Sequence, residues 1–427
     1  MRAADAELLT DVAPGTPMQE NFKRYWLPVM LSDALEADGA PVRFTMLCED
    51  YVAFRATDGR VGVFDPQCPH RRCSLELANN RDCALTCLFH GWKFHVSGKC
   101  VETPNEPDPD FPRRVKFNHY PVREAAGVVW VHLGAGEPPR FSDFVFNRVD
   151  HDQVLSRAAI CHYNWLTGLE AILDPSHVGL LHRNWTDQAP KQGFSGDIQK
   201  MSKSLAPVIE CELTDWGFRY AAIRDMPDGS RYVRVTEHVS PSLCFIANSL
   251  ATRKLAIMSV PIDCEWSIQW YFWHSPDEPL PETDRRYAIG NTHPDHGNFY
   301  QGLRGKPNWG QDREAMRQGT NYTGFHDIMY EDLVVGEAQG AIPDRSREHL
   351  CTADRAIVFA RRNLLRQLRE PDGGGEEATS TADGFDYGAL QAIVCKIDDG
   401  EDWRQAADRR MAGRARRLGS GEHLPQT

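Results

Sequence analysis

Residues 68–90 read CPHRRCSLELANNRDCALTCLFH, and this stretch decides the fold of the first part of the chain. It contains a Cys-x-His pair, Cys68 and His70, and a Cys-x2-His pair, Cys87 and His90, with 16 residues between the pairs. Two thiolates on one iron and two imidazoles on the other are the ligands of a histidine-ligated two-iron two-sulfur cluster. The four residues therefore predict such a cluster, held between two loops.

A structural zinc site with two cysteines and two histidines is the alternative. Zinc signatures usually place both cysteines together and both histidines together, whereas here each short loop mixes one of each. The order therefore favours the iron–sulfur interpretation, in the pattern of a Rieske centre. Pro66, Pro69, Gly91 and Trp92 fit the tight turns and the shielding that a cluster needs.

Length and composition describe an acidic protein of more than one domain. The chain has 427 residues, a formal net charge of −12 and 41% hydrophobic residues, and two domains with a sizeable core are expected at this length. The negative charge argues against nucleic acid as a partner. The N-terminus MRAADAELLTDVAPG has neither a basic leader nor an apolar run, and no apolar stretch has spanning length, so we expect a cytoplasmic protein without membrane contact. Its twelve cysteines do not resemble a disulfide framework.

The hydrophobic pattern divides the chain into three parts. In the N-terminal segment 1–40, residues 17–35 have a helical apolar pattern interrupted by Pro28, and we expect this segment to pack on the C-terminal domain. From 41 to 138, short runs rich in Val, Phe, Tyr and Trp are punctuated by Asp-Gly, Ser-Gly and Ala-Gly pairs, which predicts a small antiparallel β domain with hairpin turns.

The larger domain, residues 139–427, mixes helices and strands. A helical stretch near 161–183 precedes alternating strands over 208–273, a Pro- and Gly-rich excursion over 277–310, and a second helical stretch over 311–369. Residues 370–384 are a low-complexity loop, and a helical C-terminal extension with a basic tail follows. The fold class predicted for the whole chain is α+β.

A second candidate metal site lies in EAILDPSHVGLLH, residues 170–182. Two histidines, His177 and His182, with a carboxylate such as Asp174 would form the facial triad of a non-haem iron oxygenase, which keeps positions open for dioxygen and substrate. On a regular helix, residues five apart lie about 140° around the axis, so the two histidines converge only if the helix is bulged or broken. Pro175 is placed to begin a new turn. A His-x4-His pair alone is more often two unrelated histidines, and the cluster motif upstream reverses that preference.

Taken together, these motifs resemble the oxygenase (α) component of Rieske non-haem iron aromatic-ring hydroxylases, in the phthalate-dioxygenase-like branch. The matching stretches are YWLPVMLSDAL, CPH with CLFHGWKF, DPSHVGLLH, and AQGAIPDRSREHL followed by the RRNLL helix, and they span nearly the whole chain. The resemblance implies a Rieske domain and a catalytic domain with a curved antiparallel sheet flanked by helices, of the helix-grip, START-like type. It also implies one two-iron two-sulfur Rieske cluster and one mononuclear iron(II).

The resemblance also selects ligands that chemistry alone leaves open. It assigns the iron to His177, His182 and an aspartate just upstream of AQGAIPDR, which is Asp332. From chemistry alone any carboxylate of that region could bind iron: Asp327, Glu331, Asp332, Glu337 and Asp344. Glu331 and Asp327 are the alternatives to Asp332.

Asp174 matches the residue that bridges the two metal centres in the family. By similarity it hydrogen-bonds a cluster histidine of one subunit and an iron-ligand histidine of another, with His90 and His177 as the expected ends. Such a carboxylate would also orient the imidazole. The structural alternative is a helix cap ahead of Pro175, and the two roles are compatible.

Three residues of the cluster loops depart from family patterns. Respiratory Rieske proteins carry one further cysteine in each loop, joined by a disulfide; here Cys73 stands in the first loop, but Phe89 occupies the partner position in the second. Cys73 is therefore expected to be a small buried thiol, unless Cys83 or Cys100 pairs with it. Arg72 and Phe89 replace a common glycine and a common tyrosine.

An aromatic carboxylate is the expected substrate, because the branch includes enzymes for phthalates, chlorobenzoates, phenoxybenzoates and methoxylated benzoates. A carboxylate in an apolar pocket calls for arginine, and the candidates on the strand pattern are Arg219, Arg224 and Arg234. Arg234 alternates with Val233 and Val235, so it faces solvent if the valines face the core, and it is a clamp if the strand lines the pocket. We take Arg234 and Arg224 as the substrate candidates.

The leading functional hypothesis is an oxygenase component that dihydroxylates an aromatic carboxylate with dioxygen and NAD(P)H-derived electrons from a separate flavin and iron–sulfur reductase. Monooxygenation and O-demethylation stay open, because the same metal centres support them. A Rieske electron carrier without catalysis is the alternative of another class, although a carrier needs only the first domain. Iron quantitation separates these classes, with three irons per chain for the oxygenase and two for the carrier. The resemblance further implies a role in aromatic hydrocarbon catabolism and a homotrimer or a hexamer of stacked trimers.

Overall fold

The computed structural model describes residues 1–184, 204–247, 253–282, 305–369, 385–398 and 400–419. Its α-helices are α1 (Ala3–Thr10), α2 (Pro17–Lys23), α3 (Val145–Arg148), α4 (Trp165–Leu173), α8 (Arg313–Arg317), α9 (Ile328–Ala338), α10 (Arg355–Arg369) and α11 (Trp403–Gly419). Short 3-10 turns are η1 (Ser32–Ala34), η2 (Leu75–Leu77), η3 (Phe111–Arg114), η4 (His177–Gly179), η7 (Pro307–Gly310), η8 (Arg345–Arg347), η9 (Thr352–Asp354) and η10 (Tyr387–Ala389). The low-complexity loop and most of the excursion over 277–310 lie outside the described residues.

The strands form four antiparallel sheets. The strands of the first part are β1 (Trp26–Leu31), β2 (Val42–Met46), β3 (Glu49–Arg55), β4 (Val61–Phe64), β5 (Asn79–Arg81), β6 (Ala84–Thr86), β7 (Lys93–His95), β8 (Cys100–Glu102), β9 (His119–Tyr120), β10 (Val122–Ala125) and β11 (Val128–His132). Those of the second part are β12 (Val154–Cys161), β13 (Val208–Thr214), β14 (Gly217–Asp225), β15 (Arg231–Val239), β16 (Leu243–Ile246), β17 (Lys254–Pro261), β18 (Ser267–His274) and β19 (Ile393–Ile397).

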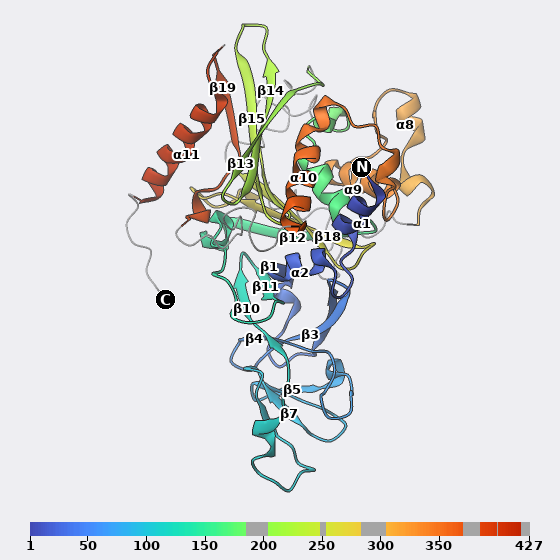
Figure 1. The fold of residues 1–427 in the computed structure, drawn as a ribbon, viewed down its shortest axis with the longest axis vertical. Coiled ribbons are helices and arrows are strands. Elements are labelled where there is room, and N and C mark those ends of the chain that lie inside the picture. Colours follow the sequence, from blue (N-terminus) through green and yellow to red (C-terminus); the bar gives the residue numbers. More distant parts are fainter. Residues whose placement is uncertain (185–203, 248–252, 283–304, 370–384, 399, 420–427) are drawn as a thin grey trace.

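The smaller, N-terminal body is built from three of these sheets, in the orders β1-β11-β10, β2-β3-β4-β9 and β5-β6-β7-β8. It occupies the lower half of Figure 1, with β5 and β7 near its tip. A compact apolar cluster between the two four-stranded sheets includes Phe54, Phe64 and Phe94, all fully buried. The predicted small antiparallel β domain is therefore confirmed.

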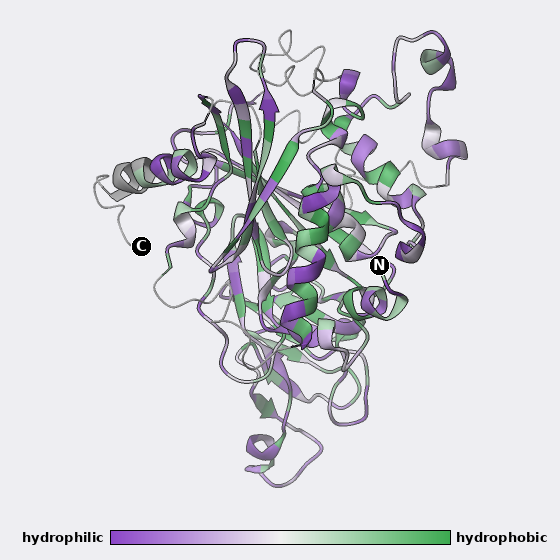
Figure 2. Ribbon diagram, turned by 45° about the horizontal axis from the view of Figure 1, so that its top comes forward, coloured by the Kyte–Doolittle hydropathy of each residue, from purple (hydrophilic) through white to green (hydrophobic). Residues whose placement is uncertain are grey.

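The larger body is organised by the fourth sheet, in the order β12-β18-β17-β16-β15-β14-β13, with β19 added along β15. α11 lies on one side of this sheet, and α4, α9 and α10 lie on the other (Figure 1). α10 carries hydrophobic residues between hydrophilic ones (Figure 2), as expected for a helix that packs one face inward. This mixture of an antiparallel sheet with flanking helices confirms the α+β class. Among the described helices, none is long and apolar enough to cross a membrane.

The structure corrects the prediction at two elements. Residues 17–23 are helical, with Thr16 as N-cap and Pro17 in the first turn, but Trp26–Leu31 is strand β1 and pairs with β11, so the helical pattern predicted over 17–35 was wrong beyond the first turns. A strand buried along nearly its whole length has no alternation that distinguishes it from a helix. β19, before the C-terminal helix, was not predicted.

Strand β15 presents two buried faces. Val233 and Val235 pack toward α11 in a cluster that includes Ile393 and Trp403. Arg234, which lies between these two valines in the strand, is also buried and points to the opposite side of the sheet. The solvent-facing alternative for Arg234 is therefore wrong: the valines face a core, yet Arg234 on the other face is only 7% exposed.

Glu237 lies on the α11 side of β15. Because of this residue, we expect the free energy of unfolding to fall as the pH rises from about 4.5 to about 8. It is fully buried; Oε2 accepts a hydrogen bond from Trp216 Nε1 (3.1 Å), and Oε1 has no partner among the described residues. Burial raises the pKa of Glu237 from 4.5 to about 8; Arg219 opposes this, whereas Asp408 and Glu212 add to it. Between these two pH values the unfolded chain binds fewer protons than the folded chain, so the free energy of unfolding drops by up to about 1.4 kcal/mol per pH unit.

The Glu237→Gln variant has no proton to lose at this position and should flatten that fall. Denaturant unfolding at pH 6 and pH 8 measures the effect, with the variant gaining on the wild type at the higher pH. Parallel losses of stability in both proteins would contradict the expectation.

Candidate metal centres

The two cluster loops share one backbone geometry. The amide of Arg72 donates to the carbonyl of Cys68 (2.9 Å), and the amide of Gly91 donates to the carbonyl of Cys87 (3.0 Å). In both loops the residue four after the cysteine has a positive φ, 61° at Arg72 and 72° at Gly91. Glycine adopts this conformation without cost, and Arg72 adopts it despite its Cβ atom. The matched turns aim the two cysteines at each other.

The four predicted cluster residues converge between these loops. Cys68 and Cys87 are buried, and the rings of His70 and His90 lie 4.5 Å apart between centroids. Burial, followed by the neighbouring Cys87 thiol, raises the pKa of Cys68 to about 12, and iron would displace that proton. His90 Nδ1 is buried without a hydrogen-bond partner in the described part of the chain. An orphaned imidazole nitrogen beside two facing thiols fits a two-iron two-sulfur cluster.

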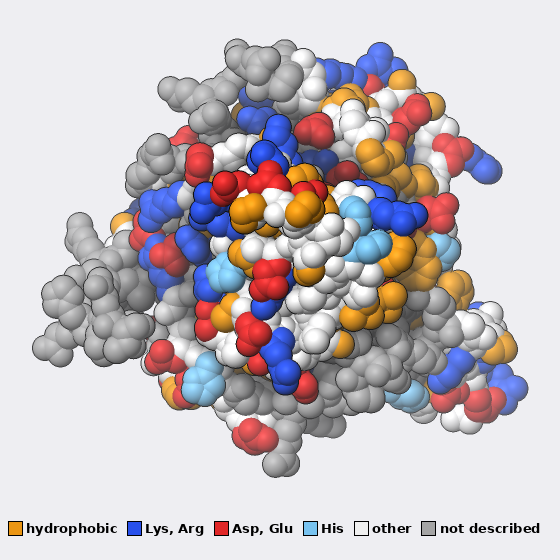
Figure 3. All heavy atoms as spheres, turned by 90° about the horizontal axis from the view of Figure 1, so that it is seen from below, with side chains coloured by type: hydrophobic (Ala, Val, Ile, Leu, Met, Phe, Trp, Pro, Cys, Tyr) orange, Lys and Arg blue, Asp and Glu red, His pale blue; other side chains and the backbone are white. Residues whose placement is uncertain are grey.

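The surroundings of the cluster site are apolar and partly open. Trp92 stacks on His70, with ring centroids 4.5 Å apart and an interplanar angle of 5°, and its Nε1 donates to Asn105 (2.7 Å). Leu88 and Phe89, next to His90, are 65% and 52% exposed. Figure 3 views the molecule from this end and shows hydrophobic side chains beside histidines.

All twelve cysteines of the chain lie in the described residues, and none of them, Cys73 included, forms a disulfide. Cys73 is half-buried rather than fully buried, and its Sγ lies 3.9 Å from the carbonyl oxygen of Ser74.

The second predicted site begins where helix α4 breaks. The helix ends at Leu173, Asp174 follows with extended backbone (φ −87°, ψ 108°), and η4 starts at His177. Asp174 Oδ1 accepts hydrogen bonds from the amide (2.7 Å) and the hydroxyl (2.6 Å) of Ser176, which shapes this turn. After this break, His177–Gly179 is a 3-10 turn and residues 180–182 continue as a turn, so the two histidines are not on a regular α-helix, as their spacing required.

His177, His182 and Asp332 come together at this break. Asp332 Oδ1 lies 3.0 Å from His182 Nε2 and 3.5 Å from His177 Nε2, and one ligand atom from each residue lies within 4.8 Å of the others. They form the only such group of three or more among the residues that the structure describes. Two imidazole nitrogens and one carboxylate oxygen in this arrangement suit iron(II) with open positions.

Carboxylates on the far side of both imidazoles orient them. His182 Nδ1 lies 2.7 Å from Glu331 Oε2, and Thr323 donates its hydroxyl to the other Glu331 oxygen. His177 Nδ1 lies 3.4 Å from Asp174 Oδ2. Partners of this kind fix ring orientation and make the opposite nitrogen a better ligand.

The charges in this site favour its ionised forms. Burial alone would lower the pKa of His182, but Asp332 and then Glu331 raise it to about 9. Burial alone would raise the pKa of Asp332, but His182 and His177 hold it below its ordinary value. The pKa of Asp174 is also lowered. Burial alone would raise it, but the contacts with His177 and Ser176 outweigh burial, so the carboxylate is ionised near neutral pH.

The other carboxylates of this region have separate partners. Asp327 caps α9 through the amide of Met329 (2.8 Å), Glu337 accepts from the amide of His162 (3.0 Å), and Asp344 caps η8. Glu331 supports His182 on the nitrogen that faces away from Asp332. The structure therefore separates Asp332 from the four alternatives, a distinction that sequence chemistry alone did not provide.

The candidate arginines divide between the two faces of the sheet. Arg219 points toward α11 and pairs with Glu212 (2.8 Å) and Asp408 (2.7 Å), so it is not a substrate ligand. Arg224 and Arg234 are buried on the other face, and Arg224 Nη2 donates to the carbonyl of Pro175 (3.0 Å), between Asp174 and His177 in sequence.

These two buried cations lie close enough to affect each other. Burial, followed by the charge of Arg234, lowers the pKa of Arg224 to about 10. Arg224 Nη1 is buried without a partner among the described residues. Arg234 Nε donates to the carbonyl of Ala247 (2.8 Å). A buried guanidinium with a spare donor beside a second one is suited to an anion.

An iron–sulfur site in a small β domain and a triad of two histidines and a carboxylate in a larger α+β domain define a two-centre iron oxygenase. The chain belongs to the family of Rieske oxygenase α subunits. Residues 25–121 match the Rieske [2Fe-2S] domain model, and residues 131–419 match the model described as "LigXa C-terminal domain like".

Curated relatives support this membership along nearly the whole chain. The phthalate 4,5-dioxygenase oxygenase subunit of Pseudomonas putida is 37% identical over 93% of both chains. The 3-chlorobenzoate-3,4-dioxygenase oxygenase subunit of Comamonas testosteroni is 32% identical over 96% of this chain and 99% of that protein. The 5,5'-dehydrodivanillate O-demethylase oxygenase subunit of Sphingobium sp. (strain NBRC 103272 / SYK-6) is 30% identical over 88% and 82%.

Solved structures support the fold. The terminal oxygenase of carbazole 1,9a-dioxygenase from Novosphingobium sp. KA1 superimposes with a TM-score of 0.58 at 20% identity, covering 86% of this chain and 99% of that one. The reduced complex between oxygenase and ferredoxin in carbazole 1,9a-dioxygenase gives 0.55 at 18% identity, covering 88% and 99%. The cofactors of this family, one Rieske cluster and one mononuclear iron, are those that the two donor sets fit.

Proposed function

We propose that this chain is the oxygenase component that hydroxylates an aromatic carboxylate, with dihydroxylation as the leading reaction. The observation that carries the substrate class is the buried pair Arg224 and Arg234 on the sheet face that adjoins the iron loop, with one Arg224 donor unpaired among the described residues. Relatives named for phthalate and 3-chlorobenzoate support the same class.

In this proposal Cys68, Cys87, His70 and His90 hold the cluster, and His177, His182 and Asp332 hold the iron. When bound, the cluster stores electrons and the iron activates dioxygen. The chain's own residues do the remaining work. Glu331 and Asp174 fix the imidazoles, and the arginines hold the substrate carboxylate and so orient the ring.

The proposal includes an assembly in which neighbouring copies complete one another. Each copy of the chain has three parts in this proposal: an N-terminal segment (1–40), a Rieske domain (41–138) and a catalytic domain (139–427). The cluster loops lie at the lower end of Figure 1 and α9 at the upper right, with the N-terminal sheets between them. Asp174 therefore suits a contact with His90 of an adjacent copy, in a homotrimer or stacked trimers of a cytoplasmic protein that receives electrons from a separate flavin and iron–sulfur reductase.

Product analysis tests this proposal. The holoprotein, supplied with an artificial reductase and dioxygen, is given phthalates, halobenzoates and methoxylated benzoates, and the products are identified. A cis-diol product from a ring carboxylate supports dihydroxylation. Loss of a methyl group as formaldehyde would support O-demethylation, the second candidate, which the dehydrodivanillate relative favours. Turnover of none of these substrates, or two irons per chain, would contradict the proposal.

Arg224→Gln and Arg234→Gln test the substrate carboxylate site. Each should raise KM for the aromatic carboxylate about 10- to 100-fold, because a hydrogen bond to a charged group contributes about 1.5–3 kcal/mol. An uncharged amide of the same acid should lose far less. Arg219→Lys, at a buried arginine on the opposite face, is the matched control. Equal losses for the acid and the amide, or normal turnover of the acid by Arg234→Gln, would eliminate the carboxylate site.

A further inference from the structure

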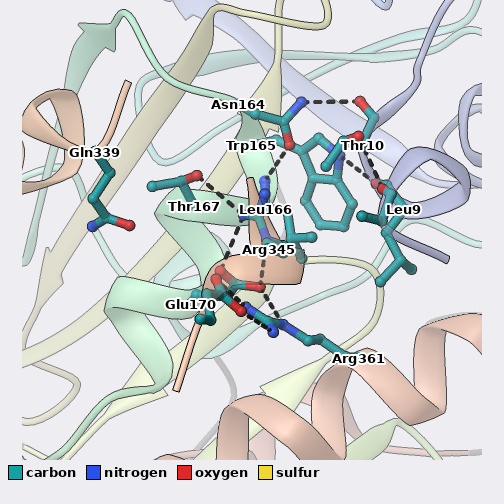
Figure 4. Close-up of polar contacts among 12 residues, drawn as sticks. Leu9, Thr10, Asn164, Trp165, Leu166, Thr167, Glu170, Gln339, Arg345 and Arg361 are labelled. Carbon is teal, nitrogen blue, oxygen red and sulfur yellow. Dashed lines mark hydrogen bonds and ion pairs between the residues drawn. The ribbon is translucent and has the colours of Figure 1, made fainter. Parts of the chain in front are cut away.

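The stretches AQGAIPDRSREHL and RRNLL contain no proposed metal ligand, yet the structure brings an arginine of each to one largely buried carboxylate. Glu170, on α4, accepts Arg361 Nε on Oε1 (2.6 Å) and Arg345 Nη2 on Oε2 (3.0 Å). The side chains of Arg345, Arg361 and Glu170 are 1%, 6% and 13% exposed. Figure 4 shows the two guanidinium groups reaching Glu170 from different elements.

We call Glu170, Arg345 and Arg361 the Glu170 clamp. Two further contacts complete this clamp. Arg345 Nη2 also donates to Thr167 Oγ1 on α4 (3.1 Å), and Arg361 makes a forked pair with Glu348 (2.7 and 3.1 Å). The two arginines and two glutamates balance in charge. Glu348 and Arg345 belong to the same segment that follows α9, so the clamp ties α4 to the stretch beyond the helix that carries Asp332.

The first turn of α4 is held by other groups. Asn164 caps the helix and donates to the carbonyl of Thr10 (2.9 Å), and Trp165 Nε1 donates to the carbonyl of Leu9 (3.1 Å), as Figure 4 shows. The hydroxyl of Ser259 donates to the carbonyl of Trp165 (2.7 Å). The first turn is thus fixed independently of Glu170.

The position of Glu170 links the clamp to the iron site. It lies four residues before Asp174, one helical turn away, and Asp174 is the C-cap from which the chain turns to His177. Buried ion pairs contribute little net stability compared with apolar packing, but they demand a specific geometry. The clamp therefore fixes the orientation of the last turn of α4, and with it the position of Asp174.

We propose that Glu170, Arg345 and Arg361 are positioning residues for the iron site: they fix the C-terminal turn of α4 and thereby place Asp174 and His177 opposite His182 and Asp332. This inference rests on the proposed assignment of the iron ligands. None of the three touches the metal site, and each acts through the backbone of α4.

The test compares Glu170→Gln and Arg345→Lys with Arg219→Lys. Arg219 is a similarly buried arginine that, like Arg361, pairs with two carboxylates, but it lies on the α11 side of the sheet. Iron retention is measured by chelator competition. The geometry at the iron is read from the electron paramagnetic resonance spectrum of the ferrous protein with nitric oxide, and the cluster and the fold are followed by the Rieske signal and Tm.

We expect both clamp variants to lose the mononuclear iron about 10-fold more readily, at the lower end of what partners of metal ligands contribute, with an altered nitrosyl spectrum and an unchanged Rieske signal. Arg219→Lys should lower Tm without changing the nitrosyl spectrum. Thr167→Val, which removes only one contact of Arg345, should give a smaller change of the same kind if the other variants do not fold.

Wild-type iron retention and nitrosyl spectra in the clamp variants, or equal changes in Arg219→Lys, would overturn the inference. Wild-type protein that holds only the two cluster irons would instead overturn the assignment of the iron site, so the two failures are distinguishable.

Discussion

The Asp332→Ala protein is expected to keep its cluster, to lose the mononuclear iron, and to turn over at less than about a thousandth of the wild-type rate, a loss of about 4 kcal/mol in transition-state stabilisation. Asp332 Oδ1 lies 3.0 Å from His182 Nε2 and 3.5 Å from His177 Nε2. Without it the site offers iron(II) two neutral imidazoles and no anionic ligand, a set that iron(II) binds weakly. Glu331 still reaches His182 Nδ1, so the imidazole should stay in place.

Iron and sulfide analysis of the purified variant measures this effect. Two irons per chain with full sulfide and unchanged Rieske absorption are expected, against three irons in the wild type. Asp327→Asn is the matched control, because Asp327 also lies at α9 but caps the helix, and asparagine caps as well as aspartate. A third iron retained by Asp332→Ala would point to Glu331 as the ligand.

The cluster site could be predicted from sequence because its proposed ligands lie close together in the chain. Cys68, His70, Cys87 and His90 sit on two short loops, and their order alone separates iron–sulfur from zinc. The iron site was predictable only in part. The spacing of His177 and His182 required a distorted helix, but Asp332, the proposed third ligand, is 150 residues beyond His182, and resemblance was needed to choose it.

What the sequence did not predict depends on tertiary packing. Glu331 and Asp332 are adjacent on α9, and the turn of the helix sends one to each nitrogen of His182. The clamp on Glu170 joins residues up to 191 positions apart, and its charged residues look like a solvated surface when read along the chain. Strand β1 was read as helix because its partner β11 lies about a hundred residues away.

The second large effect is expected at Asp174. Asp174→Asn should keep both the cluster and the iron, yet turn over about 100-fold more slowly, the upper range for a partner of a metal ligand. Asparagine can still accept from Ser176 through Oδ1, so the turn after α4 should survive. It replaces the anionic oxygen that faces His177 Nδ1 with an amide donor or a neutral acceptor.

The proposed role of Asp174 as a bridge predicts where this loss falls. In stopped-flow mixing of reduced protein with dioxygen and substrate, reoxidation of the cluster should slow while binding of the substrate stays normal. Ser176→Ala is the control, because it removes only the hydroxyl contact with Asp174 Oδ1 and leaves the carboxylate facing His177. If Asp174→Asn reoxidises its cluster at the wild-type rate with both metals present, Asp174 serves only to shape the turn, and electrons reach the iron by another contact of His177 or His182.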